Sequence, residues 1–329
     1  MAGVSHSTVS RALANSPLVN NRTCQIIQGI ASEQGYQVNQ VARNLKNRST
    51  HTIGLVVPEF SNPYYPKLIQ AIANQTAHSG FSLQLQLSGT RQENERICLT
   101  SLRENRVDGI LLITAEKGIV DRHYVDQLVQ SGFPIVILGW VPDAEHLDIV
   151  TGDDAHGGRE LAHYLYTLGH RNFAIIGKAA HRGPFDRNEG FISKLGELGC
   201  TLPQENIYLA DTLATVHAAL TRLLKSSPLP TAIFAYQDSI AMLVYEALRA
   251  LGVHVPGQIS VVGFDDLDFT KYITPRLTTV GAHIEPLATA FVERLLSRIL
   301  APKEMCEPQC IVVKPKLIIG DSGAPPPRV

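Results

Sequence analysis

Residues 2–13 bring together side chains that could read DNA. Their pattern predicts a helix from about His6 to Ala14, capped by Ser5. One face of this helix carries Val9, Ala12 and Leu13, and another carries His6, Ser7, Ser10 and Arg11. Hydroxyl, imidazole and guanidinium groups in the first turns of a helix suit base edges and phosphates in a major groove. An ordinary amphipathic surface helix has the same pattern, so the segment alone leaves both interpretations open.

The acidic pair Asp265 and Asp266 is a second candidate for chemistry, because it follows a predicted strand. No nucleophile or base stands beside it, which favours hydrogen bonding to a ligand over catalysis. The sequence also lacks a dinucleotide fingerprint, a phosphate loop, a Gly-x-Ser-x-Gly elbow and a His-Glu-x-x-His motif. We therefore predict a protein that is not an enzyme, with no catalytic residue and no cofactor.

Three histidines, His156, His163 and His170, recur every seven residues. Gly157 and Gly158 are interpreted as turn elements, so the three rings are not expected to share one face. We interpret them as surface or helix-end histidines, and we predict no metal site.

The charge is unevenly distributed along the 329 residues. The whole chain has 29 basic and 30 acidic residues, whereas residues 1–50 have five basic residues and one acidic residue. A small basic segment on an acidic body is typical of a phosphate-binding module joined to a domain for another ligand. On charge alone, chance clustering explains it equally well.

The elements that must position these groups follow from the hydrophobic pattern. Strands are predicted at 53–57, 82–87, 109–113, 135–138, 173–176, 207–209, 232–235, 259–263 and 310–319, with helix-length segments between most of them. Apolar strands alternating with helices indicate parallel sheets covered on both faces. Because nine strands fit two sheets better than one, we predict an α/β fold with two doubly wound lobes. A ligand then belongs at the carboxyl ends of the strands, near the loops 58–63, 140–143 and 264–268.

Residues 1–50 instead predict a small all-α head. A second helix runs from about Asn21 to Gln34 after a cap at Asn20, and residues 48–52 have the polar composition of a linker. Glycines are predicted to end five later helices in the left-handed conformation: Gly80, Gly132, Gly169, Gly199 and Gly252. No apolar stretch reaches the roughly 18 residues of a membrane span, and there is no secretory signal. We therefore expect a cytoplasmic protein.

The chain resembles the lactose-repressor/galactose-repressor (LacI/GalR) family of bacterial transcription regulators. Residues 2–13 are similar to the DNA-reading helix of its helix-turn-helix, 19–23 and 35–39 to the next helix start and turn, and 39–45 to its hinge helix. Further landmarks follow in family order at 53–55, 62–65, 107–110, 168–171, 187–191, 263–266 and 275–279. The resemblance implies two periplasmic-binding-protein-like lobes preceded by a helix-turn-helix head.

For the head, the resemblance implies DNA contacts from Ser5, His6, Ser7, Thr8, Ser10, Arg11, Asn20, Arg43 and Leu45. His6, Ser7 and Arg11 match base-reading positions, and Thr8 and Ser10 match phosphate contacts. Leu45 matches a leucine that wedges between base pairs in the minor groove and bends the duplex; packing against the core is its alternative role. So short a hinge helix should form mainly on DNA, because isolated helices under about 12 residues rarely persist.

For the effector site, the resemblance implies contacts from Tyr64, Tyr65, Trp140, Arg187, Gln237 and Asp265. Arg187 matches the ligand-binding arginine, and Asp265 matches an aspartate that accepts hydrogen bonds from sugar hydroxyls or a purine. For Tyr65 and Trp140 a buried core role is equally open. Gln237 stands where asparagine is common, and Thr212 stands where several relatives have an aromatic ring, so the effector's identity stays open.

The expected organisation is a head at 1–50 with a hinge helix at 39–47, a first lobe at 51–151 and 283–310, a second lobe at 152–282 and 311–322, and a disordered tail at 323–329. The function that the resemblance implies is an effector-responsive repressor of a sugar or small-metabolite operon. It would bind a palindromic operator as a homodimer and respond to a sugar, sugar derivative or nucleobase. A solute-binding protein with the same core and no DNA function is the alternative; a sugar-processing enzyme ranks third.

Family members carry a further helix before Ala2, and this sequence begins inside the turn that follows it. We interpret this as a mis-called start or a truncation. This exact chain is therefore expected to bind operator poorly, and a version extended upstream is expected to bind well.

Overall fold

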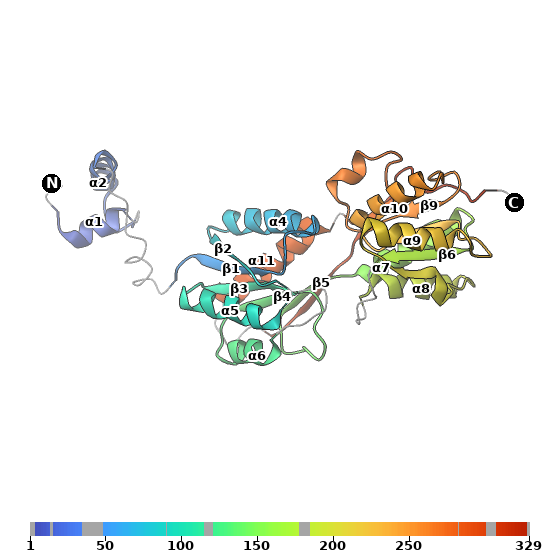
Figure 1. Ribbon diagram of the computed structural model, residues 1–329. Coiled ribbons are helices and arrows are strands. Elements are labelled where there is room, and N and C mark those ends of the chain that lie inside the picture. Colours follow the sequence, from blue (N-terminus) through green and yellow to red (C-terminus); the bar gives the residue numbers. More distant parts are fainter. Residues whose placement is uncertain are drawn as a thin grey trace. The chain divides into compact units, whose positions relative to one another are not determined.

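The computed structural model describes residues 4–13, 16–34, 49–89, 91–114, 121–177, 185–281, 283–300 and 307–327. Contacts divide the chain into two compact units, residues 1–51 and residues 52–329 (Figure 1). No helix in the described ranges is long and apolar enough to cross a bilayer.

The first unit contains the helices α1 (His6–Leu13) and α2 (Asn21–Glu33), which pack against each other. Asn20 caps α2, because its Oδ1 accepts a hydrogen bond from the Thr23 backbone N–H at 2.8 Å. Both predicted helices are confirmed to within a residue at their ends. The hinge helix predicted at 39–47 lies outside the described residues.

The second unit has two lobes, and the first is built on a six-stranded parallel sheet ordered β11-β5-β4-β3-β1-β2. Its strands are β1 (Thr52–Val57), β2 (Ser82–Leu87), β3 (Gly109–Ile113), β4 (Ile135–Leu138), β5 (Ile149–Gly152) and β11 (Cys310–Val313). Its helices are α4 (Tyr64–His78), α5 (Gln92–Glu104), α6 (Arg122–Gln130) and α11 (Ile284–Leu300).

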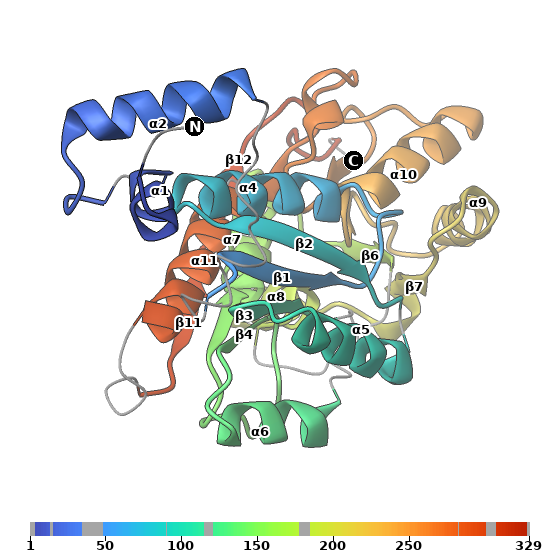
Figure 2. The same cartoon turned by 90° about the vertical axis from the view of Figure 1, so that its left-hand side faces the viewer.

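Strand alternation explains how this sheet is covered on both faces. Ile53 and Leu55 of β1 lie in the apolar cluster shared with α4 and α11, whereas Val56 lies in the cluster shared with α5 and α6. Figure 2 shows α4 on one side of the sheet and α5 and α6 on the other. Successive side chains point to opposite faces, so strands buried on both sides are apolar throughout.

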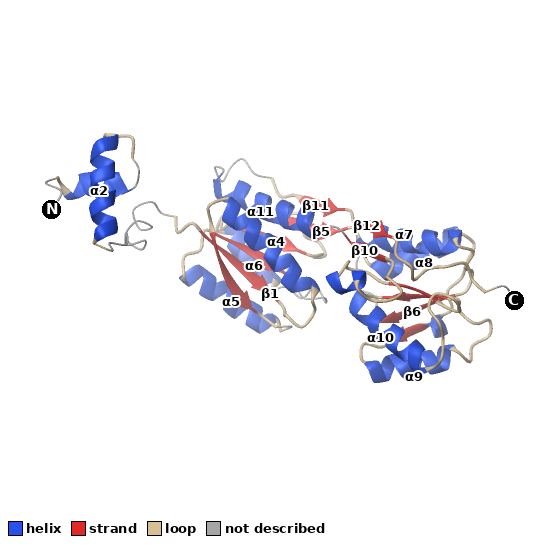
Figure 3. Ribbon diagram, turned by 90° about the horizontal axis from the view of Figure 1, so that it is seen from above, coloured by secondary structure: helices blue, strands red, loops and turns tan. Residues whose placement is uncertain are grey.

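The second lobe repeats this plan with a four-stranded parallel sheet ordered β7-β6-β8-β9. Its strands are β6 (Phe173–Gly177), β7 (Ile207–Leu209), β8 (Ala232–Ala235) and β9 (Ser260–Val262). The helices α7 (Asp154–Thr167) and α8 (Arg187–Glu197) cover one face, and α9 (Leu213–Leu223) and α10 (Asp238–Ala250) cover the other (Figure 3). Two short 3-10 helices, η1 (Gln204–Asn206) and η2 (Asp268–Lys271), complete the lobe.

The chain passes between the lobes after β5, after β10 (Thr279–Gly281) and between β11 and β12 (Lys316–Ile318). β10 and β12 pair antiparallel beside the second lobe. The predicted two-lobe α/β fold is thus confirmed, and so are all five left-handed glycines. The sequence prediction missed β5 and β10, which are only four and three residues long.

One long strand predicted at 310–319 is two strands. Pro315 lies in the break between them, where a residue without an N–H cannot continue the ladder. β11 pairs with β5 over its whole length, from Cys310 opposite Ile149 to Val313 opposite Gly152. The predicted lobe boundary at 310–311 therefore falls inside a strand of the first lobe.

The end of the chain is held on the second lobe by His170, which is 1% exposed. Its Nε2 lies 2.9 Å from the carbonyl oxygen of Ala324, and a carbonyl only accepts, so Nε2 carries the proton. Nδ1 then accepts from the Thr231 hydroxyl at 2.8 Å. The Ala324 N–H donates to Ser260 Oγ at 3.0 Å. The expectation of disorder from residue 323 is therefore wrong for Ala324, and His170 is a buried helix-end residue.

Candidate functional site

Arg187 is the centre of a charged cluster in the second lobe. It is the first residue of α8, and its side chain is 13% exposed. Nη2 donates to Asp154 Oδ2 at 2.5 Å, and Nη1 donates to Asp265 Oδ1 at 3.1 Å and to the Tyr236 carbonyl at 2.9 Å. The structure therefore brings together Arg187 and Asp265, which were both predicted, and adds Asp154, which the sequence prediction missed.

The position of Arg187 depends on glycines that allow the backbones of α7 and α8 to come into contact. A Cβ on Gly158 would lie 2.0 Å from the Arg187 carbonyl oxygen, and a Cβ on Gly190 would lie 2.0 Å from the Ala155 carbonyl oxygen. Any side chain at either position would collide with backbone. The prediction that Gly157 and Gly158 form a turn is wrong, because both are buried within α7. Gly158 serves close contact with α8, and Gly157 leaves room for the side chains of Val280 and Phe264.

Aromatic rings and carboxylates fix the charge of Arg187. Its Cζ lies 3.8 Å from the centroid of the Phe264 ring and 4.8 Å from that of Tyr236. Burial alone would lower the pKa of the guanidinium, but Asp154 and Asp265 raise that pKa well above its usual value. Arg187 is thus a permanently charged group in a site largely shielded from water.

The loop that carries Asp265 has an unusual backbone. Asp265 has a φ of 110° and Asp266 a φ of 51°, both in the region that non-glycine residues rarely adopt. The buried Asp238 holds this loop, since its Oδ2 accepts from Leu267 N at 2.9 Å and its Oδ1 accepts from the Thr279 hydroxyl at 2.6 Å. Burial and the nearby Asp265 raise the pKa of Asp238. Strained backbone held by its surroundings is characteristic of ligand sites.

Tyr64 brings the first lobe to this cluster. It begins α4, where its N–H donates to Asn62 Oδ1 at 3.0 Å. Burial raises the pKa of its hydroxyl, and the carboxylates of Asp154 and Asp265 raise it further. Both carboxylates belong to the second lobe, and the raised pKa keeps the Tyr64 hydroxyl protonated at neutral pH.

Lys67 makes a direct bond between the lobes. From α4, its Nζ donates to the Asp266 carbonyl at 2.9 Å and to Asp268 Oδ1 at 3.2 Å. This contact holds α4 against the same loop that carries Asp265. Neither the composition nor the spacing of the sequence indicated this pair, whose members are 201 positions apart.

The remaining predicted effector residues are Tyr65 in α4, Trp140 after β4 and Gln237 before α10. Tyr65 is 6% exposed and lies in the apolar core with α11, whereas Trp140 is partly buried in the loop after β4. Gln237 precedes α10, and its Nε2 donates to Ser239 Oγ at 2.8 Å. Thr212, where an aromatic ring is common, caps α9.

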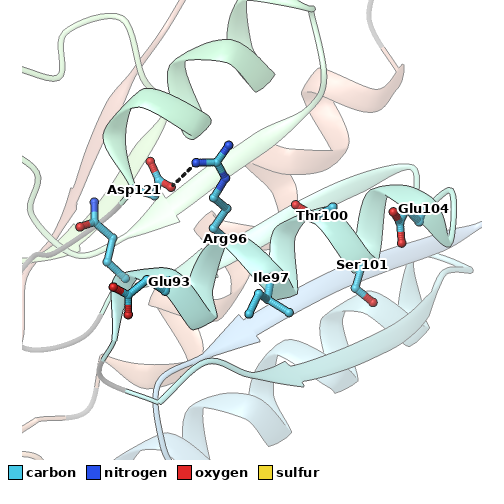
Figure 4. A pocket seen from close by; sticks show the side chains of 8 residues that line it. Glu93, Arg96, Ile97, Thr100, Ser101, Glu104 and Asp121 are labelled. Atoms are coloured by element: carbon cyan, nitrogen blue, oxygen red, sulfur yellow. Dashed lines mark ion pairs between the residues drawn. The ribbon is translucent and has the colours of Figure 1, made fainter.

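A separate hollow of about 690 Å³ lies in the first lobe (Figure 4). It is lined by Gln92, Glu93, Arg96, Ile97, Thr100, Ser101, Glu104 and Asp121. All of these except Asp121 belong to α5, and Arg96 Nη1 lies 3.8 Å from Asp121 Oδ2. Because the second lobe contributes none of the lining, this hollow is distinct from the cluster at Arg187.

In the head, two of the predicted DNA contacts cap helices. Ser5 Oγ accepts from the Thr8 N–H at 3.3 Å and lies 2.8 Å from Ser7 Oγ, so Ser5 caps α1. Thr8 is partly buried, while Ser7 and Arg11 are exposed. Asn20 caps α2. The side chains of His6 and Ser10, and all of Arg43 and Leu45, lie outside what the structure describes.

Comparisons with known proteins agree with this architecture. Residues 162–323 match the periplasmic binding protein-like domain family. The chain is 32% identical over 341 residues to the HTH-type transcriptional repressor PurR of Proteus mirabilis, covering all of this chain and 96% of that protein. It is 31% identical over 326 residues to the HTH-type transcriptional regulator DegA of Bacillus subtilis, covering 98% and 96%.

A solved structure of the transcriptional regulator CelR with cellobiose is 27% identical, covers 98% of this chain and 97% of that one, and has a TM-score of 0.73. Fold and site together define a regulator with a periplasmic-binding-protein-like core. The chain belongs to the LacI/GalR family of HTH-type transcriptional regulators.

Proposed function

We propose that this protein is a repressor whose affinity for operator DNA changes when a small molecule binds beside Arg187. The observation that carries the proposal is the cluster of Arg187 with Asp154 and Asp265, on a loop that Lys67 of the other lobe contacts. Buried charges with convergent polar groups at strand ends are the usual setting of a ligand site in such folds. The family relatives are transcriptional regulators, and the CelR structure holds cellobiose.

The chemistry of the cleft suits a ligand that contacts both lobes at once. A ligand hydroxyl can donate to Asp154 or Asp265, while the Tyr64 hydroxyl contributes from α4. Such a ligand binds the closed arrangement of the lobes more tightly than the open one, so it increases the closed population. The first lobe begins at Thr52, directly after the first unit of the chain, so a change in the lobes reaches the DNA-binding part through the segment that joins them.

The head supplies the DNA contacts in this proposal. Arg11 and Ser7 are exposed on α1, where a guanidinium can bind guanine in a bidentate manner and a hydroxyl can bind either base or phosphate. A homodimer would place two such helices on the halves of a palindromic operator. Leu45 would enter the minor groove beside them.

The test is DNA binding by a version of the chain extended upstream, measured by fluorescence anisotropy on genomic fragments that this version itself selects. Arg11→Ala should weaken binding to the selected fragments by about tenfold or more, because one base-reading contact is worth roughly 1–3 kcal/mol. Arg249→Ala is the matched control, since this exposed arginine lies on α10 and pairs with Glu246.

Loss of affinity only in the Arg11 variant supports the proposal. Equal binding by both variants, or no preference for any fragment with or without added sugars and nucleobases, contradicts it. Ligand binding without any DNA preference would favour the solute-binding alternative.

A further inference from the structure

We propose that Asp154 makes the cleft select ligands that present hydroxyl groups, and not a carboxylate or phosphate, to Arg187. The inference rests on the proposed function, because it takes the cleft as the effector site, and it names the chemistry of the ligand there. Asp154 is then a specificity residue: it occupies one terminal nitrogen of Arg187 and adds a negative charge beside it.

The first argument is the charge of the cluster. Each terminal nitrogen of Arg187 already donates to a carboxylate, one from Asp154 at 2.5 Å and one from Asp265 at 3.1 Å. One cation and two anions leave the three side chains with a net charge of −1. An anionic ligand group at Arg187 would be a third anion beside one guanidinium, and this repulsion is strong in a site shielded from water.

The second argument is that two titratable groups beside the cluster, Tyr64 and His283, do not offset this charge, and that Lys67 is paired with Asp268. Tyr64 has a raised hydroxyl pKa and stays neutral. Asp154 Oδ1 and His283 Nε2 both lie within 3.5 Å of the point that a Cβ on Gly152 would occupy. Burial lowers the pKa of His283, so this imidazole is also neutral at pH 7. The cluster keeps its negative charge at neutral pH.

The third argument is that two carboxylates favour hydroxyl donors. Asp154 has a side chain that is 24% exposed, and it reaches Arg187 through one oxygen, Oδ2. A carboxylate has about four lone-pair sites, and an O–H donor bonded to it makes one of the stronger hydrogen bonds in proteins. A polyol can therefore join Asp154 without displacing it from Arg187, whereas an anion must displace it.

The experiment compares anion binding by the full wild-type chain and by Asp154→Asn. The probes are inorganic phosphate and glucuronate at constant ionic strength, with the melting temperature and the calorimetric Kd as readouts. In the wild type we expect neither anion to bind at Arg187, so neither should raise the melting temperature or give a measurable Kd. Asp154→Asn should bind phosphate at least about tenfold more tightly, because Nη2 is released from a carboxylate and the net charge rises by one.

Glu189→Gln is the matched control. Glu189 is exposed on the same helix, so this change removes one negative charge near Arg187 without removing one of the guanidinium's partners. It should bind phosphate no better than the wild type. Asp154→Ser repeats the test with a smaller side chain, and adding Arg187→Gln to either Asp154 variant should abolish the gain.

Two results would overturn the proposal. One is a wild-type chain that binds either anion and loses this binding in Arg187→Gln. The other is a folded Asp154 variant that binds phosphate no more tightly than Glu189→Gln does. Because no DNA is present in this experiment, its outcome is distinct from that of the operator test: either idea can fail while the other stands.

Discussion

Arg187 is held by protein carboxylates, and this has a thermodynamic consequence. Its guanidinium is fixed by Asp154, Asp265 and the Tyr236 carbonyl, and it lies against the Phe264 ring. A preorganised arginine loses little side-chain entropy when a ligand arrives, so more of the interaction energy appears as affinity. The strained loop at Asp265 serves the same end.

Glu95 is a buried titratable residue in the first lobe, and it affects how stability depends on pH. It is 3% exposed on α5, and its Oε1 accepts from the Asp121 N–H at 3.0 Å, at the start of α6. Burial raises the pKa of Glu95, the hydrogen bond from the Asp121 N–H lowers it, the Asp121 carboxylate raises it, and the net pKa is about 7. The folded chain therefore holds a proton here that the unfolded chain releases near pH 4.5.

This raised pKa predicts a pH-dependent effect of Glu95→Gln. The contribution of the protonated carboxyl is fully present below the unfolded pKa and is lost as pH rises through about 7. Between pH 5.5 and 8.5, the variant should gain on the order of 2 kcal/mol of unfolding free energy relative to the wild type. Urea unfolding at several pH values measures this, with the exposed Glu93→Gln as control. Parallel stability curves for wild type and Glu95→Gln would contradict the assignment.

At the scale of elements, the contact between α7 and α8 determines where Arg187 stands. Gly158 and Gly190 let the two backbones meet, and Asp186 caps α8 by accepting from the N–H groups of Asn188 and Glu189. A helix that begins at a fixed cap against a fixed neighbour presents its first side chain in one place. Arg187 is that first side chain.

Alanine substitutions in α8 test this contact with an internal control. Gly190→Ala should destabilise the fold by about 2–3 kcal/mol, because its Cβ would lie 2.0 Å from a backbone oxygen. Gly196→Ala, on the same helix with no heavy atom within 4 Å of the new Cβ, should be neutral or stabilise by about 0.5–1 kcal/mol. Urea unfolding distinguishes the two. Similar losses at both positions would show that helix contact is not the reason for glycine.

The element scale also shows what a single sequence can reveal of the site. Arg187 and Asp265 were predicted from motifs that resemble the family, and Gly169 and Gly199 from helix periodicity. Gly157 and Gly158 were misassigned because glycine serves turns and close contacts alike, and neighbouring residues do not distinguish the two. Asp154 and Lys67 were missed because their partners lie 33 and 201 positions away, and no local pattern encodes such distances.

At the scale of the whole molecule, the two-lobe plan was predictable because it depends on repeated apolar strands and amphipathic helices. The short strands β5 and β10 were not, since three or four residues carry too little pattern. The attachment of residues near 324 to the second lobe was also missed, because a proline-rich end resembles a frayed one. Its anchor, His170, is far away in the sequence.

His170 gives the whole fold an acid-sensitive point. Burial lowers its pKa below 6.5, so its contribution to stability is complete above pH 6.5 and is lost as pH falls, when the unfolded chain binds the proton first. His170→Asn should lower stability at pH 7 by roughly 1–3 kcal/mol through lost hydrogen bonds, and its stability should fall less between pH 7 and 5. Thermal unfolding measures both slopes. The exposed His78→Asn should match the wild type; an unchanged slope in His170→Asn would refute the assignment.

The pairing of β11 with β5 has a consequence for biosynthesis. The first lobe starts at residue 52, yet its edge strand is made only at residues 310–313, after the second lobe has been translated. The ribosome therefore releases a nascent first lobe with an open edge along β5, a surface prone to wrong pairing. A premature stop before residue 310 would remove the strand that pairs with β5 and so damage the lobe nearest the start of the chain.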